Sequence, residues 1–174
     1  LAGRRLAVEE GLAVLRSDDA EILDLLGAVY RVRRAVHGNR VHLNFLINAK
    51  SGRCGEDCGY CSQSRRSTAE VQKYPLLEEE EILAGARAAA DRGAGTYCIV
   101  TSGRGPIEAE LARLEATVRR IKAQWRLSIC VSPGLLTLEH ARRLKAAGVS
   151  RVNHNLNTSQ RYYAKICTTH SYQD

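Results

Sequence analysis

Three of the six cysteines of this chain lie within eight positions of residues 50–64, KSGRCGEDCGYCSQS. Cys54, Cys58 and Cys61 have the spacing C-x-x-x-C-x-x-C. Thiols this close in sequence indicate a disulfide knot, a metal site or an accident of composition. Thiolates are ligands both of zinc and of iron–sulfur clusters, so the spacing indicates these two kinds of metal chemistry beside the disulfide alternative.

The rest of the sequence argues against disulfides. No apolar run approaches the ~20 residues of a membrane-spanning helix, and the first residues lack the apolar region of a secretion signal. We therefore expect a cytoplasmic protein, and thiols remain reduced in that compartment.

A structural zinc site usually has four protein ligands, taken from cysteine pairs and histidines. No fourth ligand of suitable spacing accompanies the three cysteines. The histidines, none of which is near in sequence, are His37, His42, His140, His154 and His170. Three thiolates with one vacant position suit a [4Fe-4S] cluster in which one iron can bind a small molecule. A non-enzymatic zinc-binding or interaction domain is the alternative.

The cysteine loop follows the first of several alternating elements. Residues 1–40 have the apolar periodicity of helices. Strands are then predicted at 41–48, 95–102, 127–132 and 150–157, and helices at 77–92, 107–125 and 137–147. This alternation is typical of parallel βαβ units, whose right-handed crossovers place the strands side by side.

Loop segments lie at or just past the carboxyl end of each predicted strand. The cysteine loop is succeeded along the chain by SGRGP (102–106), PGLL (133–136) and NHNLNTS (153–159). Loops at this end of the strands form the active sites of (β/α) barrels. We predict an α/β fold: residues 1–40 as an N-terminal helical extension, and 41–174 as the first half of a TIM-type barrel, with about four strands.

A full (β/α) barrel needs ~200 residues or more, so we expect the natural protein to continue beyond residue 174. The chain also contains no methionine, not even at position 1, which indicates an incomplete or trimmed reading frame.

The net charge of +7 is spread over apparent helix faces such as RVRR (31–34). With only one Phe, one Trp and seven Tyr, the sequence lacks the aromatic residues that accompany basic patches in nucleic-acid binding. The charge also suits anionic small molecules.

The cysteine spacing with an aromatic residue directly before the last cysteine, Tyr60-Cys61, resembles the radical S-adenosylmethionine (radical SAM) superfamily. In that superfamily, the open iron of a [4Fe-4S] cluster chelates the amino and carboxylate groups of S-adenosylmethionine. The resemblance implies a TIM-type barrel and reductive cleavage of this cofactor to a 5′-deoxyadenosyl radical.

Within the superfamily, three segments resemble the biotin synthase family: NAKSGRCGEDCGYCSQS, TYCIVTSGRGP and NHNLNTSQRYYAKICTTHSYQD. The resemblance extends from about residue 25 to the end. It implies a sulfurtransferase of biotin biosynthesis that inserts sulfur into dethiobiotin, with a [2Fe-2S] cluster as sulfur donor. It also implies an electron donor such as flavodoxin or ferredoxin, a homodimer, and no nucleic-acid or membrane partner. Another radical SAM enzyme acting on a different small molecule is the alternative.

The resemblance assigns five cysteines to the two clusters. Cys54, Cys58 and Cys61 match the [4Fe-4S] ligands, and Cys98 and Cys130 match two [2Fe-2S] ligands. The third thiolate and an arginine ligand would lie beyond residue 174, so we expect this chain alone not to make biotin. The family gives Cys167 no ligand role.

Other positions match cofactor and substrate contacts. Tyr60 matches the aromatic residue beside the adenine, and Asn155 and Asn157 match positions that hold the ribose hydroxyls. Thr101 to Gly103 match the segment whose backbone carbonyls face the methionyl amino group. Asn153 matches a residue that contacts dethiobiotin. Amides can donate and accept hydrogen bonds, although Asn also occurs in polar turns for its backbone preferences. No residue is assigned as a catalytic acid or base.

Overall fold

The computed structural model describes residues 3–52 and 54–174. The first two residues of the expected extension and Arg53 of the cysteine loop lie outside the described residues. The chain divides into two compact units, Leu1–Val41 and His42–Asp174. The first unit contains helix α1 (Val8–Leu15), a 3-10 turn (Asp19–Glu21) and helix α2 (Ile22–His37).

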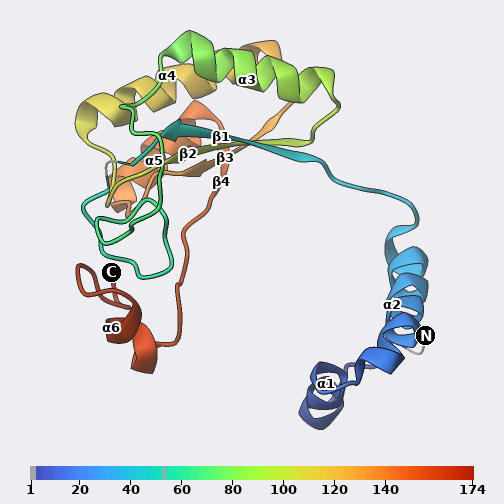
Figure 1. The fold of residues 1–174 in the computed structure, drawn as a ribbon. Coiled ribbons are helices and arrows are strands. Elements are labelled where there is room, and N and C mark those ends of the chain that lie inside the picture. The colour runs from blue at the N-terminus through green and yellow to red at the C-terminus, as the bar shows by residue number, and fades with distance from the viewer. Residues whose placement is uncertain (1–2, 53) are drawn as a thin grey trace. The chain divides into compact units, whose positions relative to one another are not determined.

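The second unit is a four-stranded parallel sheet of strand order β1-β2-β3-β4 with connecting helices (Figure 1). This arrangement confirms the predicted α/β class and the βαβ alternation. Its elements are β1 (Asn44–Lys50), α3 (Glu79–Asp91), β2 (Thr96–Thr101), α4 (Glu108–Gln124), β3 (Ser128–Ser132), α5 (Leu138–Ala147), β4 (Val149–Val152), a 3-10 turn (Gln160–Tyr162) and α6 (Tyr163–Ile166).

Local sequence signals explain where α5 begins and ends. The hydroxyl of Thr137 accepts a hydrogen bond from the backbone N–H of His140 at 3.1 Å, which satisfies a donor at the start of the helix. Gly148 ends the helix in the left-handed conformation, with φ of 108°. The helix is therefore short, and the chain turns directly into β4.

Strand β4 is shorter than the predicted strand 150–157. It ends at Val152, and the last bond to β3 runs from the Asn153 N–H to the Val131 carbonyl at 2.8 Å. Because β3 itself ends at Ser132, the following residues have no strand to pair with. The polar segment after β4 thus leaves the sheet, and Asn157 adopts a left-handed φ of 65°.

The two faces of the sheet differ in character. On one face, buried side chains of β2 and β3 pack against α3, α4 and α5 to form the core. The strands contribute Tyr97, Ile99, Ile129 and Val131, and the helices contribute Ile82, Leu111, Val118 and Leu144. Successive strand residues point to opposite faces, so Cys98 and Cys130 face away from this core. The described residues contain no helix long and apolar enough to cross a membrane.

Candidate functional site

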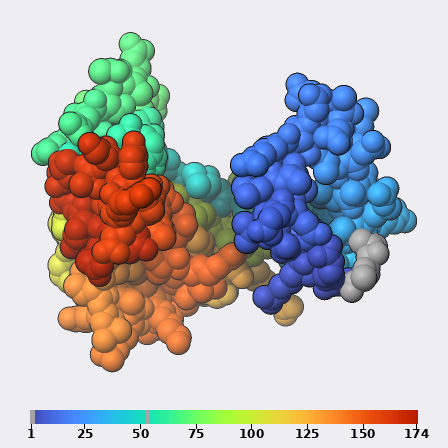
Figure 2. Space-filling view, turned by 90° about the horizontal axis from the view of Figure 1, so that it is seen from below, coloured from blue at the N-terminus to red at the C-terminus, as the bar shows by residue number. Residues whose placement is uncertain are grey.

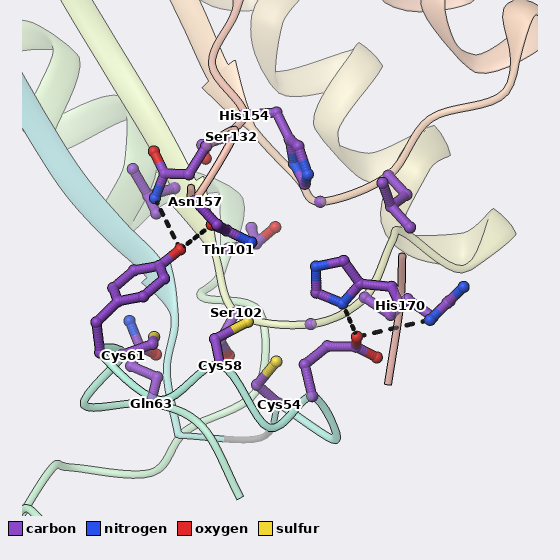
Figure 3. A pocket seen from close by; sticks show the side chains of 18 residues that line it. Cys54, Cys58, Cys61, Gln63, Thr101, Ser102, Ser132, His154, Asn157 and His170 are labelled. Atoms are coloured by element: carbon purple, nitrogen blue, oxygen red, sulfur yellow. Dashed lines mark hydrogen bonds and ion pairs between the residues drawn. The ribbon is translucent and has the colours of Figure 1, made fainter. Parts of the chain in front are cut away.

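A pocket of about 180 Å³ lies where the carboxyl ends of the strands meet the cysteine loop. Figure 3 shows Cys54, Cys58 and Cys61 on one side of it, facing Thr101 at the end of β2 and Asn157 in the segment after β4. The remaining lining residues are Glu56, Tyr60, Gln63, Val100, Ser102, Gly103, Arg104, Ser132, Gly134, Leu135, His154, Asn155 and His170. Segments distant in sequence therefore converge on the three thiols.

Tight turns shape the cysteine loop. The N–H of Cys61 donates to the carbonyl of Cys58 at 3.2 Å, and the N–H of Ser64 donates to the carbonyl of Cys61 at 3.1 Å. The Arg65 N–H reaches back to the Glu56 carbonyl at 2.9 Å. All three thiols are free and partly buried, so they are available as ligands.

Residues 163–174, called here the C-terminal segment, hold the cysteine loop in place. Figure 2 shows this segment packed against the loop. The Asp57 carboxylate, which is almost fully buried, accepts from the backbone N–H groups of Thr168 at 2.8 Å and Thr169 at 3.2 Å, and from the Thr168 hydroxyl. The Gly59 N–H bonds to the Ile166 carbonyl at 2.8 Å. These hydrogen bonds, those from Thr168 foremost, hold the pKa of Asp57 well below its usual value.

Glu56 forms a second link between the loop and the segment. Its carboxylate contacts His170 Nδ1, accepts from the Thr169 hydroxyl at 2.8 Å and lies 3.5 Å from Arg104 Nη1. Burial alone would raise the pKa of Glu56, but these hydrogen bonds and the positive charges outweigh it, so the pKa is lowered. The negative charges of Glu56 and Asp57 are thus compensated largely by groups of the C-terminal segment and by Arg104.

Cys167 of the C-terminal segment lies directly beside the cysteine loop. Its Sγ is 3.9 Å from Cys58 Sγ, 3.2 Å from Asp57 Oδ1 and 3.2 Å from His170 Nδ1. Burial, together with the neighbouring Cys167 thiol, raises the pKa of Cys58 to about 12. Cys58 is therefore a neutral thiol in the metal-free protein, and a metal must displace its proton to bind.

The asparagines after β4 reach the same pocket. The Tyr60 hydroxyl contacts Asn157 Oδ1, and Asn155 Nδ2 donates to that hydroxyl at 3.4 Å (Figure 3). Asn157 Nδ2 donates to the Tyr163 hydroxyl at 2.8 Å. Three predicted cofactor residues thus meet at one wall, whereas Asn153, the predicted substrate residue, is not among the pocket lining.

The loops after β2 and β3 pack backbone against backbone on the opposite wall. The Leu135 N–H bonds to the Arg104 carbonyl at 2.6 Å. Gly134 has a left-handed φ of 86°, and a Cβ there would collide with the Arg104 backbone. Glycine is consequently required at this position, and the contact fixes the segment that carries Thr101 and Gly103.

Cys98 and Cys130 lie apart from this pocket. They are partners in the β2–β3 register, and Cys130 is in turn the partner of Arg151 on β4. Leu46 of β1 pairs with Cys98, so one row of side chains crosses the sheet face opposite the helices. Burial and the neighbouring Cys130 raise the pKa of Cys98 to about 12. The two cysteines therefore form a second set of potential ligands, separate from the three thiols of the cysteine loop.

The sequence model of the Radical SAM superfamily matches residues 49–174. The chain belongs to the radical SAM superfamily. This radical SAM chain is 51% identical over 174 residues to a biotin synthase of Lysinibacillus sphaericus, and 50% identical over 174 residues to a biotin synthase of Rhodopirellula baltica. It covers 52% and 48% of these proteins, so it spans about half the length of the curated relatives it matches.

Solved structures support the same fold. A crystal structure of methylornithine synthase (PylB) matches 98% of the chain with a TM-score of 0.78 at 22% identity. The FeFe-hydrogenase maturase HydG from Carboxydothermus hydrogenoformans matches 99% with a TM-score of 0.77 at 23% identity. The chain covers 50% and 40% of these proteins, respectively, and the likeness is consistent with the predicted partial barrel.

The donor set of the pocket fits the [4Fe-4S] cluster and S-adenosylmethionine of this superfamily. Three thiols of one short loop offer three ligands, and backbone and amide groups face them across the pocket. In addition, the buried Ser102 hydroxyl in the pocket wall has no hydrogen-bond partner within the described part of the chain. Such an orphaned polar group suits a polar ligand.

Sequence reasoning missed the residues that support the thiols. Asp57, Thr168 and Thr169 gave no signal because their partners are more than a hundred positions apart. Arg151 could have been noticed, since it stands two positions before Asn153 in a predicted strand. Cys167 was given no ligand role, yet the fold places it against Cys58.

Proposed function

We propose that this radical SAM chain is part of a biotin synthase, which inserts sulfur into dethiobiotin. The observation that carries the proposal is the register pair Cys98–Cys130, on the sheet face opposite the helices. A radical SAM enzyme needs only the three loop cysteines for its [4Fe-4S] cluster, whereas a biotin synthase also needs thiolates for a second cluster. The identity of about half of all positions to biotin synthases supports the same conclusion.

In this proposal, Cys54, Cys58 and Cys61 would hold the [4Fe-4S] cluster and leave one iron for S-adenosylmethionine. When bound and reduced, the cluster supplies the electron that cleaves the cofactor to a 5′-deoxyadenosyl radical. The protein must bring the cofactor into line with the target carbon and keep water away.

The chain's own residues would orient the cofactor by stacking and hydrogen bonds. Tyr60 would lie against the adenine, and the Asn155 and Asn157 amides would bind the ribose hydroxyls. They contact the Tyr60 hydroxyl already, so the aromatic ring and both amides are prearranged. The carbonyls of Thr101 to Gly103 would accept from the methionyl amino group.

Asn153 would bind dethiobiotin. Its backbone is fixed by the bond to Val131, and an amide can both donate to and accept from a ureido group. Cys98 and Cys130 would hold the [2Fe-2S] cluster with ligands from outside this chain. An electron donor of the flavodoxin or ferredoxin class, a homodimer and a reducing cytoplasmic location are part of the proposal.

Two variants of the full-length gene product test the proposal. After anaerobic reconstitution with iron and sulfide, Cys98→Ser should still cleave S-adenosylmethionine to 5′-deoxyadenosine but produce no biotin from dethiobiotin. Cys58→Ala should lose both reactions. Cys167→Ser is the matched control, because it removes a buried thiol to which the proposal gives no role in turnover.

Spectra separate the proposal from its alternative. A [2Fe-2S] signal that disappears in Cys98→Ser would support biotin synthase. A full-length protein that shows only a [4Fe-4S] centre and cleaves S-adenosylmethionine without response to dethiobiotin would be a different radical SAM enzyme. The 174-residue chain alone should form no biotin, because it supplies only two of the second cluster's ligands.

A further inference from the structure

Cys58, Cys167 and His170 form a group of potential metal ligands beside the pocket. Their ligand atoms all lie within 4.8 Å of one another. Cys167 is buried and His170 is nearly so, with 7% of its side chain exposed. Figure 3 shows His170 on the same side of the pocket as Cys54 and Cys58. The radical SAM assignment uses Cys58 alone of these three.

The spacing of the three atoms suits a tetrahedral zinc ion. Zn–S bonds of about 2.3 Å at tetrahedral angles require two sulfurs about 3.8 Å apart, and Cys58 Sγ and Cys167 Sγ are 3.9 Å apart. His170 Nδ1 is 3.2 Å from Cys167 Sγ, slightly closer than the edge of such a tetrahedron. A small shift of the ring would bring all three atoms to ligand distances.

We propose that the cluster-free protein binds one zinc ion at Cys58, Cys167 and His170. Two thiolates balance the charge of Zn²⁺, and the imidazole binds as a neutral ligand through Nδ1, which gives up its contact with the Glu56 carboxylate. Both thiol protons are released to solvent, and the proton on Nδ1 moves to Nε2 or to solvent. The fourth position falls to water or to the carboxylate of Glu56, which contacts Nδ1 of His170. Two of these ligands, Cys167 and His170, belong to the C-terminal segment and are therefore far in sequence from the cysteine loop.

The hydrogen bonds that support these ligands are already formed in the metal-free protein. Asp57 accepts from Cys167 Sγ at 3.2 Å and keeps its backbone donors from Thr168 and Thr169 when that thiol binds zinc. These bonds hold the C-terminal segment against the loop before any metal arrives. The ligands from two distant parts of the chain are therefore preorganised, which favours tight binding.

Zinc at this site would exclude the [4Fe-4S] cluster because both need the Cys58 thiolate. This consequence rests on the proposed function, whereas zinc binding itself does not. The zinc form would be a storage or misassembled state, from which the metal must leave before the cluster is built. In the wild-type chain, one equivalent of zinc should slow iron uptake, and Cys167→Ser should remove that inhibition.

An anaerobic titration of the metal-free, reduced chain with zinc against a chromophoric chelator tests the site. One zinc should bind, and Cys167→Ser and His170→Ala should each weaken binding at least about tenfold. Cys61→Ser is the matched control and should change affinity by less than about twofold. Circular dichroism checks that each variant is folded.

The opposite pattern would overturn the proposal: Cys61→Ser loses zinc and Cys167→Ser retains it, which would place the metal on the three loop cysteines. Cobalt(II) provides a measurement without any substitution. Its sulfur-to-metal charge-transfer absorption should correspond to two thiolates, and an intensity for three would contradict the site. Neither experiment involves iron, S-adenosylmethionine or dethiobiotin, so failure here leaves the proposed function intact.

Discussion

Asp57 in the cysteine loop accepts hydrogen bonds from both the backbone N–H and the hydroxyl of Thr168, which lies 111 positions later. This contact joins the loop that carries the thiols to the C-terminal segment. Because the loop has only short turns of its own, the position of Cys58 depends on this anchor. The protein thus fixes its thiols by a long-range contact.

Asp57→Asn should weaken the anchor, because an amide nitrogen cannot accept the bonds that both carboxylate oxygens now receive. We expect iron retained after anaerobic reconstitution and desalting to fall severalfold, while circular dichroism stays unchanged. Asp24→Asn, an exposed aspartate in α2, is the control. Iron retention equal to that of the wild type in Asp57→Asn would show that the loop does not need this contact.

Substitutions of Asn157 can distinguish the role of its side-chain amide from that of its backbone conformation. Its φ of 65° is unfavourable for most residues. Asn157→Gly removes the amide and relieves the backbone, so S-adenosylmethionine affinity should fall about fivefold, the equivalent of one lost hydrogen bond of about 1 kcal/mol. Asn157→Asp keeps an acceptor and should bind nearly as the wild type. Equilibrium binding to the reconstituted protein measures both, and unchanged affinity in Asn157→Gly would remove Asn157 from the ribose site.

Gly134→Ala should damage the pocket wall. The added methyl group collides with the Arg104 backbone, and the left-handed φ adds strain of about 1–3 kcal/mol. Urea unfolding should show this loss of stability. Gly55→Ala in the cysteine loop is the matched control, because its Cβ would meet no atom within 4 Å and should cost little. Equal stability of the two variants would contradict the packing of the loops after β2 and β3.

The buried hydroxyl of Tyr97 should make the stability of the fold depend on pH. Burial raises the pKa of its hydroxyl, which donates to the Ile82 carbonyl at 3.0 Å. Above pH ~10 the unfolded chain ionises this group while the folded chain does not, so its contribution to stability is complete below that pH and is lost as pH rises further. Tyr97→Phe should cost about 1 kcal/mol at neutral pH and lose less stability than the wild type between pH 8 and 10.5. Urea unfolding measures the free energy of unfolding of both proteins across this pH range, and an equal loss in the two would contradict the prediction.

The order and type of the elements in the second unit could be predicted from sequence because each has its own periodicity and its own terminating residues, such as Thr137 and Gly148. The end of β4 could not, since it depends on where β3 stops offering partners. The thiol spacing and the asparagines indicated the pocket. The anchor on Asp57 and the proximity of Cys58 to Cys167 were not predictable, because both arise only when residues over a hundred positions apart meet.

In the proposed enzyme, Cys54, Cys58 and Cys61 leave one iron of a [4Fe-4S] cluster free for S-adenosylmethionine. The direct measurement is electron–nuclear double resonance of the reduced, reconstituted full-length protein with S-adenosylmethionine labelled with ¹⁷O in its carboxylate. We expect a hyperfine coupling that shows the label bound to iron. Absence of coupling with the cofactor bound, together with loss of the cluster in Cys167→Ser, would show four protein ligands and contradict the claim.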